Sequence, residues 1–298
     1  MIGRLVRLAL AVGFLAALLV ACGSAAFPPG SLVVGGERSV MVVRPPDHDS
    51  AVATPLLVVL HGYATDAERM ERLFPLAAGA AVKGAMVVYP EGTYNGLGHR
   101  YWNASEACCD LFDSGVDDVA YLMGLIGEIE TSVAVDRVVL FGHSNGAFMA
   151  YRLACEHGER FAAVVGVAGT LDDPPPACDA PSPPRMLHVH GTEDGVIRYD
   201  GGALPGGVLQ PPQPPYVGAE ATYETIAARS GCTTSLVQGT PFDLDEGVTG
   251  PETTPFAATC PEGRSVALWA IEGGEHEPDV YPNFAARVLG FALPDPAP

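Results

Sequence analysis

A serine between two glycines is the residue whose setting most directly indicates chemistry. Ser144 lies in Gly142-His-Ser-Asn-Gly146, which follows the apolar run Val138–Phe141 and precedes an amphipathic helical pattern. A strand, a tight turn and a helix in this order predict a nucleophile elbow, in which the serine occupies a strained turn and its hydroxyl is exposed above the sheet. Side chains at 142 and 146 would collide with a neighbouring strand or helix. The alternative is an ordinary glycine turn, since the chain contains 35 glycines.

A serine hydroxyl needs a base to take its proton and a third group to orient that base. In doubly wound hydrolases these groups follow the serine in the order Asp or Glu, then His, each after the carboxyl end of a strand. Asp194 follows a predicted strand at 185–190, and His276 follows one at 265–271. The other histidines precede the serine, end the elbow helix or precede Asp194. We therefore predict Ser144, Asp194 and His276 as catalytic residues, with Glu193 as the alternative orienting carboxylate.

Two backbone amides are the candidates for stabilising an oxyanion. The usual donors are the residue after the nucleophile and a residue in the loop after the third strand. In this chain they are Asn145 and, after His61-Gly62, Tyr63. Their amides matter here more than their side chains. Tyr63 can equally be a loop aromatic that covers the core, and the two interpretations are compatible.

Apolar strands alternate with helical patterns along the chain, which predicts an α/β fold with a mostly parallel, doubly wound sheet flanked by helices. Strands are expected at 38–45 (an antiparallel edge strand), 55–62, 84–89, 138–141, 161–167, 185–190 and 265–271, and helices at 66–83, 117–131, 218–229 and 283–291 and directly after Ser144. Residues 203–217 hold five prolines and predict an excursion over the surface, either beside the substrate or without a function. Residues 235–261 predict a polar loop.

The amino-terminal residues 1–22 have the features of a targeting segment. Arg4 and Arg7 precede an apolar run that is too short to span a bilayer comfortably. The run ends in Leu-Val-Ala-Cys22, which resembles a bacterial lipobox and predicts Cys22 as an acylated residue that anchors the protein to a membrane. The alternative is a soluble secreted protein cleaved near Ala26. Both interpretations predict export.

The remaining chain is expected to be a tether at 23–30 followed by a single domain at 31–298. The formal net charge is −19, and without the two targeting arginines it is −21, from 14 basic and 35 acidic residues. This charge argues against nucleic acid as a partner, because such binding depends on Lys and Arg neutralising phosphates. We expect a monomer.

Six cysteines remain when Cys22 is set aside, and an even number in an exported chain suggests disulfides. Six cysteines allow 15 pairings. Local order suggests Cys155 with Cys178 and Cys232 with Cys260, which leaves the adjacent Cys108 and Cys109. Zinc is the competing interpretation, but no Cys-x-x-Cys spacing occurs.

A second metal hypothesis concerns His188 and His190, which are alternate residues of one strand with Glu193 nearby. The competing interpretation is two partly buried strand histidines. We expect neither a metal nor a cofactor.

Several motifs together resemble the polyhydroxybutyrate depolymerase and feruloyl esterase group of exported α/β-hydrolases. They are Leu60-His-Gly62, Val88-Tyr-Pro90, Tyr101-Trp-Asn103, Cys108-Cys109, Asp117-Asp-Val119, Gly142-His-Ser-Asn-Gly146, Tyr151-Arg-Leu-Ala-Cys155, His190-Gly-Thr-Glu-Asp194 and Gly274-Glu-His276. The resemblance spans about residues 31 to 293. It implies the α/β-hydrolase fold and a serine carboxylic-ester hydrolase whose partner is an ester substrate, either a small molecule or a polymer. The implied mechanism has an acyl-enzyme intermediate, with Ser144, Asp194 and His276 as the triad.

The sequence departs from this group beside the histidine. The group commonly has Gly-Gly-His-x-Trp-Pro there, whereas this chain has Glu275 before His276 and Glu277-Pro278 after it. The missing aromatic leaves open whether an aromatic or polymeric ester is the substrate. Two alternative functions remain, a serine peptidase of the same fold and a non-catalytic envelope lipoprotein that binds a partner.

Overall fold

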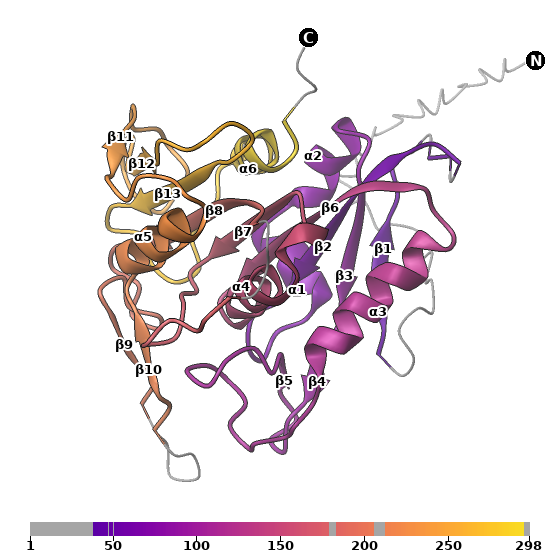
Figure 1. Cartoon of the computed structure of the whole chain (residues 1–298), viewed down its shortest axis with the longest axis horizontal. Coiled ribbons are helices and arrows are strands. Elements are labelled where there is room, and N and C mark those ends of the chain that lie inside the picture. Colours follow the sequence, from indigo (N-terminus) through magenta and orange to yellow (C-terminus); the bar gives the residue numbers. More distant parts are fainter. Residues whose placement is uncertain (1–37, 47, 50, 179–182, 206–211, 295–298) are drawn as a thin grey trace, which may run out of the picture.

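The computed structural model describes residues 38–294 except 47, 50, 179–182 and 206–211 (Figure 1). Cys22, the predicted targeting segment 1–22 and the predicted tether 23–30 lie outside the described residues. Within the described part of the chain, no helix combines the length and the apolar character needed to cross a bilayer.

Nine strands form one sheet in the order β1-β3-β2-β6-β7-β8-β13-β12-β11. The six central strands, from β3 to β13, are parallel, and β1, β12 and β11 add antiparallel strands at the two edges. The strands are β1 (Val40–Val43), β2 (Thr54–Leu60), β3 (Met86–Pro90), β6 (Val135–His143), β7 (Ala163–Val167), β8 (Arg185–Gly191), β11 (Val237–Gln238), β12 (Thr253–Ala257) and β13 (Val266–Ile271). The chain has the predicted α/β-hydrolase fold.

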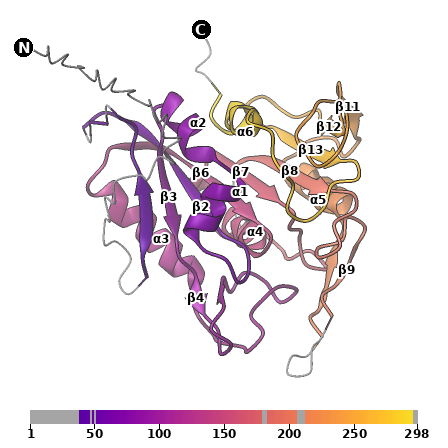
Figure 2. The same cartoon turned by 180° about the vertical axis from the view of Figure 1, so that it is seen from behind.

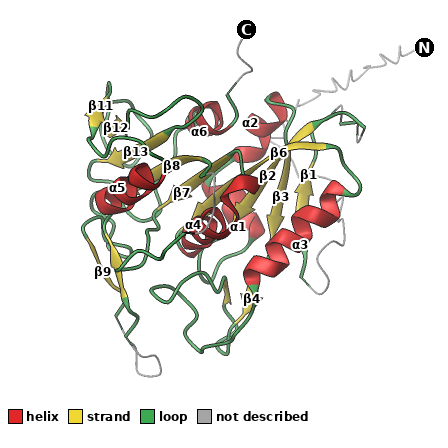
Figure 3. Cartoon of the chain, viewed as in Figure 1, coloured by secondary structure: helices red, strands yellow, loops and turns green. Residues whose placement is uncertain are grey.

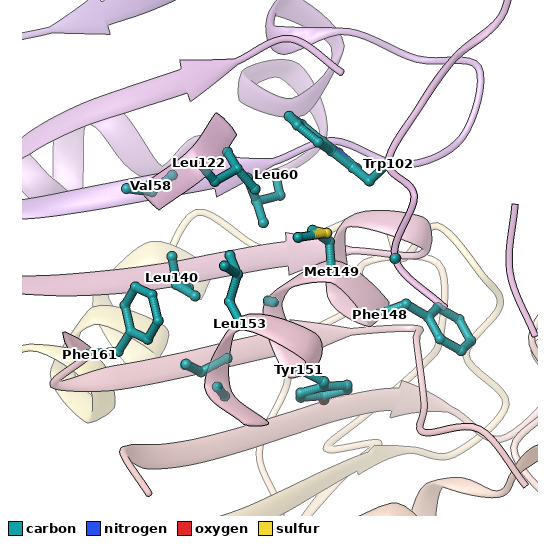
Figure 4. Packing of buried hydrophobic residues seen from close by; sticks show 14 of the residues in the cluster. Val58, Leu60, Trp102, Leu122, Leu140, Phe148, Met149, Tyr151, Leu153 and Phe161 are labelled. Carbon is teal, nitrogen blue, oxygen red and sulfur yellow. The ribbon is translucent and has the colours of Figure 1, made fainter. Parts of the chain in front are cut away.

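Helices cover both faces of this sheet (Figures 1 and 2). One face carries α3 (Asp118–Glu130), α4 (Asn145–His157) and α5 (Ala219–Arg229), and the other carries α1 (Ala67–Leu73), α2 (Leu76–Val82) and α6 (Phe284–Ala292). Alternate residues of β2 enter the two cores: Val58 and Leu60 pack with α3 and α4 (Figure 4), and Val59 packs on the opposite face. A strand buried on both faces must be apolar throughout, which is why its run was recognisable.

The helical pattern predicted at 66–83 forms two helices rather than one. Pro75 lies between α1 and α2 and has no backbone N–H to continue the first helix. The residue before a proline also avoids the helical region, and Phe74 ends α1 with φ −129° and ψ 88°. The fully buried Phe74 side chain packs against Phe141 and Phe284 at this break.

The prediction of a polar loop at 235–261 is partly wrong. This segment contains β11 and β12, and the five residues of β12 pair with residues 267–271 of β13. Only Thr253, at the start of β12, is buried, so the sequence of this strand lacks the apolar pattern from which a strand can be predicted. Its strand conformation comes from pairing with β13, which would otherwise leave its backbone groups unpaired at an edge.

Two short ribbons lie outside the main sheet. Residues 201–217 contribute β9 (Gly201–Ala203) and β10 (Pro215–Val217), while β4 (Thr93–Tyr94) and β5 (Arg100–Tyr101) belong to the long β3–α3 loop, residues 91–117. Figure 3 shows the β3–α3 loop and the β9–β10 ribbon projecting at the same end of the molecule.

Three disulfides are present in the described residues. Cys155–Cys178 and Cys232–Cys260 are bonded as local order predicted. The two remaining cysteines, Cys108 and Cys109, are bonded to each other in the β3–α3 loop.

Candidate active site

Ser144 occupies a strained turn between β6 and α4. Its backbone has φ 53° and ψ −123°, in the region that favours glycine. A Cβ on Gly142 would lie 2.1 Å from the carbonyl oxygen of Gly146, and a Cβ on Gly146 would lie 2.2 Å from that of Leu60 on β2. Both positions therefore require glycine for the reason that the sequence suggested, and the nucleophile-elbow geometry is present.

The side chains of Ser144, His276 and Asp194 form one hydrogen-bonded chain. Nε2 of His276 lies 3.0 Å from Oγ of Ser144, and its Nδ1 lies 2.8 Å from Oδ2 of Asp194. The three residues follow β6, β13 and β8, whose carboxyl ends meet at one edge of the parallel sheet. In this arrangement the imidazole can remove the hydroxyl proton while the carboxylate orients the ring. Glu193, the alternative carboxylate, is exposed, and His276 is bonded to Asp194 instead.

Backbone amides hold the carboxylate of Asp194 in place. Its Oδ1 accepts hydrogen bonds from the N–H groups of Val196 and Ile197, at 2.8 and 2.9 Å. Burial by itself raises the pKa of this carboxyl, but hydrogen bonds from His190 and His276 outweigh burial and hold the pKa below its ordinary value. Asp194 is therefore ionised at neutral pH.

The sequence predicted that the Ser144 hydroxyl is exposed above the sheet, but Ser144 is buried, with only 8% of the residue exposed. The His276 side chain, itself 16% exposed, lies against it, and the β2–α1 loop passes close by. The correction has a simple origin, since the elbow pattern describes the turn and not the loops that cover it.

The predicted oxyanion-hole residues flank Ser144. Asn145 is the first residue of α4, where a backbone N–H has no acceptor within the helix. Tyr63 lies in the β2–α1 loop, next to the stretch whose carbonyls pack on Gly146, and its hydroxyl accepts a hydrogen bond from the side chain of Asn95. The side chain of Asn145 also has a function that the sequence did not indicate: its amide is bonded to the backbone N–H and C=O of Trp102.

His143, directly before the serine, is a further residue that sequence reasoning missed. Its Nε2 donates a hydrogen bond to the backbone carbonyl of His276 at 3.0 Å, which ties the His276 loop to the elbow. Burial, followed by the nearby His276, lowers the pKa of His143 to about 4, so the ring is neutral at neutral pH. Its position beside Ser144 was a possible signal, but the contact depends on a loop 133 residues away.

The histidines considered as metal ligands are bonded to other groups. His188 contacts Tyr151 and His190, and His190 contacts Asp194 and the carbonyl of Ile197. Among the described residues, no group of three or more His, Cys, Asp or Glu side chains is arranged to hold a metal ion.

Of the two glutamates flanking His276, Glu277 forms an ion pair with Arg69 at 2.6 Å.

A groove of about 870 Å³ lies along α4, the helix that follows Ser144; we call it the lateral groove. Its walls come from the β3–α3 loop, α4, the segment after β7 and the start of β10. The lining includes Phe148, one helical turn beyond Ser144, and Asn103, next to the Trp102 that binds Asn145. Its charged lining residues are Arg152 and the carboxylates Glu106, Asp110, Asp113, Glu156, Asp172 and Asp173.

Comparison with known proteins adds related sequences and a related fold. The chain is 35% identical over 175 residues to the "Putative esterase NocK" of Nocardia uniformis, covering 58% of this chain and 48% of that protein. It is 29% identical over 244 residues to feruloyl esterase B of Piromyces equi, covering 80% of this chain and 42% of that protein. The chain thus spans less than half the length of these relatives.

A solved structure, the acetyl xylan esterase from Aspergillus awamori, shares the fold with a TM-score of 0.58 at 17% identity, over 86% of this chain and 93% of that one. These findings confirm the expected resemblance to esterases of the feruloyl esterase group. Residues 31–289 match the model of the family described as "Putative esterase", and the chain therefore belongs to this esterase family.

Proposed function

We propose that this protein is a carboxylic-ester hydrolase that uses Ser144 as its nucleophile. The observation that carries the proposal is the chain from Ser144 Oγ through both ring nitrogens of His276 to the carboxylate of Asp194. It lies where doubly wound sheets bind ligands, outside the carboxyl ends of parallel strands. Membership of an esterase family makes the ester the bond to be cleaved.

The proposed reaction has two halves. Nε2 of His276 takes the hydroxyl proton while Oγ of Ser144 attacks the ester carbonyl, and the ionised Asp194 stabilises the imidazolium that forms. The imidazolium then protonates the departing alcohol, which leaves an acyl group on Ser144. Water activated by His276 attacks this acyl-enzyme, releasing the acid and restoring the hydroxyl.

The tetrahedral intermediates of both halves carry a negative oxygen that needs donors. The backbone amides of Asn145 and Tyr63 are our candidates, because one begins α4 and the other lies on the loop facing it. The positive end of the α4 dipole adds to this stabilisation.

For the substrate, we propose acetyl or feruloyl esters of a polysaccharide. The lateral groove lies along the helix that follows Ser144, and its volume of about 870 Å³ falls in the range of about 300 to 1,000 Å³ that is common for ligand sites. Its carboxylates can accept hydrogen bonds from sugar hydroxyls, and the exposed prolines Pro174, Pro176, Pro214 and Pro215 offer apolar surface. The names of the relatives, a feruloyl esterase and an acetyl xylan esterase, support the same class.

The test compares purified protein on four substrates: an aryl acetate, a methyl hydroxycinnamate, acetylated xylan and a peptide. We expect ester hydrolysis that is lost in Ser144→Ala and kept in Ser132→Ala, a control at an exposed serine on the opposite end of β6. Release of acetate from xylan supports the polysaccharide class. Peptide cleavage without ester cleavage contradicts the proposal.

We also propose that the protein is exported and that Cys22 carries the lipid. Three disulfides support export, because such bonds persist in oxidising compartments. Full-length protein should then require detergent for extraction, whereas Cys22→Ser should be found in the soluble fraction. A mature amino terminus at Ala26 or Phe27 without lipid mass contradicts the anchor.

A further inference from the structure

A buried chain of side chains runs beneath the active site and ends on Asp194. The hydroxyl of Tyr151 lies 2.5 Å from Nδ1 of His188, and Nε2 of His188 lies 3.2 Å from Nδ1 of His190. Nε2 of His190 lies 3.2 Å from Oδ2 of Asp194 and 2.7 Å from the carbonyl oxygen of Ile197. All of these side chains are buried.

The last acceptor determines the direction of the hydrogen bond from His190, and the directions of the others follow for neutral rings. A carbonyl oxygen can only accept, so Nε2 of His190 carries a hydrogen that Ile197 and Asp194 share. In a neutral ring, Nδ1 of His190 is then an acceptor, which requires His188 to donate from Nε2. Nδ1 of His188 is in turn the acceptor for the hydroxyl of Tyr151. In this order Tyr151 donates to His188 and His188 donates to His190, and burial lowers the pKa of His188 well below its ordinary value.

Strand β7 leaves space for the contact between Tyr151 and His188. Tyr151 is on α4, whereas His188 is on β8, and β7 lies between β6 and β8 in the sheet. Gly166 of β7 is the register partner of His188, and a Cβ on Gly166 would lie 2.2 Å from the Tyr151 hydroxyl. The tyrosine therefore crosses β7 where a side chain is missing. Figure 4 shows the side chain of Tyr151 beside the ribbon of α4.

His190 fixes two parts of the Asp194 turn at once. It donates to the carboxylate oxygen that His276 also contacts, and to the carbonyl of Ile197. The N–H of Ile197 in turn holds the other oxygen of Asp194. Rotation of the Asp194 carboxylate would break its contacts with both His276 and His190.

We propose that Tyr151, His188 and His190 are positioning residues that hold Asp194 in register with His276 through this ordered chain. The inference rests on the proposed function, because it assigns Asp194 the task of orienting His276. α4 thereby contributes to the active site twice, through Ser144 at its start and through Tyr151 two turns later. The two connections, one through His276 and one through the buried chain, join the nucleophile helix to the Asp194 turn.

The experiment measures kcat and KM of the full chain on an aryl acetate for three variants and a control. His190→Leu removes the donor, His190→Gln retains an N–H, and Tyr151→Phe removes only the first hydroxyl. Tyr223→Phe is the matched control, since this buried tyrosine of α5 donates its hydrogen bond to the carbonyl of Ser235 and takes no part in the series from Tyr151 to Asp194. We expect kcat to fall roughly 10- to 100-fold in His190→Leu and roughly 3- to 10-fold in Tyr151→Phe, with KM within threefold of the parent.

His190→Gln should recover most of the lost kcat, and the downfield proton NMR signal of the His276–Asp194 hydrogen bond should shift in Tyr151→Phe but not in Tyr223→Phe. Equal kcat and an unmoved signal in Tyr151→Phe and Tyr223→Phe overturn the inference, even if His190→Leu does not fold. In that case the proposed function still stands, provided that the parent enzyme hydrolyses esters and loses this activity in Ser144→Ala. Absence of any Ser144-dependent activity would instead refute the proposed function itself.

Discussion

The side-chain amide of Asn145 is hydrogen-bonded in both directions to the main chain of Trp102. Its Oδ1 accepts from the Trp102 N–H at 2.7 Å, and its Nδ2 donates to the Trp102 carbonyl at 3.0 Å. The indole N–H of Trp102 donates to the carbonyl of His61 at 2.9 Å. The start of α4, the β3–α3 loop and the end of β2 are thus joined at one point beside Ser144. Loss of this junction should loosen the loop that forms one wall of the lateral groove.

Asn145→Ala should destabilise the protein, because it leaves the buried N–H of Trp102 without a partner, whereas the Trp102 carbonyl still accepts from the N–H of Ala104. The expected loss is roughly 1 to 3 kcal/mol for the unsatisfied group. Urea unfolding of the purified variants measures it. Asn283→Ala is the control, since this exposed residue precedes α6 without a side-chain cap. Equal midpoints for the two variants would show that the junction contributes nothing.

Ser144→Ala should lose nearly all ester hydrolysis and keep its fold. Removing a triad nucleophile typically lowers kcat about a millionfold. The strained φ of 53° already holds a residue with a Cβ, so alanine adds no backbone strain. The rate on an aryl acetate, with circular dichroism to establish folding, makes the test. Activity within tenfold of the parent would refute the serine mechanism.

Asp194→Asn should lower kcat by about four orders of magnitude, as expected when an amide replaces the orienting carboxylate and favours the wrong histidine tautomer. Glu193→Gln is the natural control, because Glu193 is the adjacent acidic residue and is exposed. Similar losses in both variants would mean that local charge, rather than the contact with His276, is what matters.

Acid should destabilise the protein between about pH 6.5 and pH 4. Burial lowers the pKa of His143 and of His61 to about 4, so both are neutral in the folded protein, whereas the unfolded chain binds these protons from pH 6.5 downward. Stability from these groups is complete above pH 6.5 and is lost as the pH falls through about 4. Urea midpoints across this range measure the slope. His143→Gln should reduce it, and an unchanged slope would contradict the argument.

Each of the two long-range disulfides should stabilise the fold by roughly 3 to 4 kcal/mol, because their sequence separations of 23 and 28 residues restrict the unfolded chain. Cys155→Ser with Cys178→Ser, and Cys232→Ser with Cys260→Ser, test them separately by urea unfolding. The adjacent pair Cys108–Cys109 closes almost no loop and should contribute much less. If removing it destabilised the protein as much, the loop-entropy explanation would be wrong.

Local sequence pattern was sufficient for the parts of this protein whose residue types are dictated by their own immediate surroundings. The strands β2, β3, β7 and β13 and residues 138–141 of β6 are buried on both faces and are therefore mostly apolar, and β8 is apolar apart from its first residue and its two buried histidines. The elbow requires glycine at 142 and 146 because backbones approach closely there. Chain order then identified Asp194 and His276, since successive βα units place their loops at one edge of the sheet.

Only the tertiary structure decided which distant groups meet. β12 is a strand because β13 offers it unpaired backbone groups, although its own sequence shows little alternation. Trp102 with Asn145, His143 with the His276 carbonyl, and Tyr151 with His188 are side-chain contacts between elements 37 to 133 residues apart. Periodicity reports whether a residue is buried, whereas its hydrogen-bond partner depends on how the helices and loops pack across the sheet.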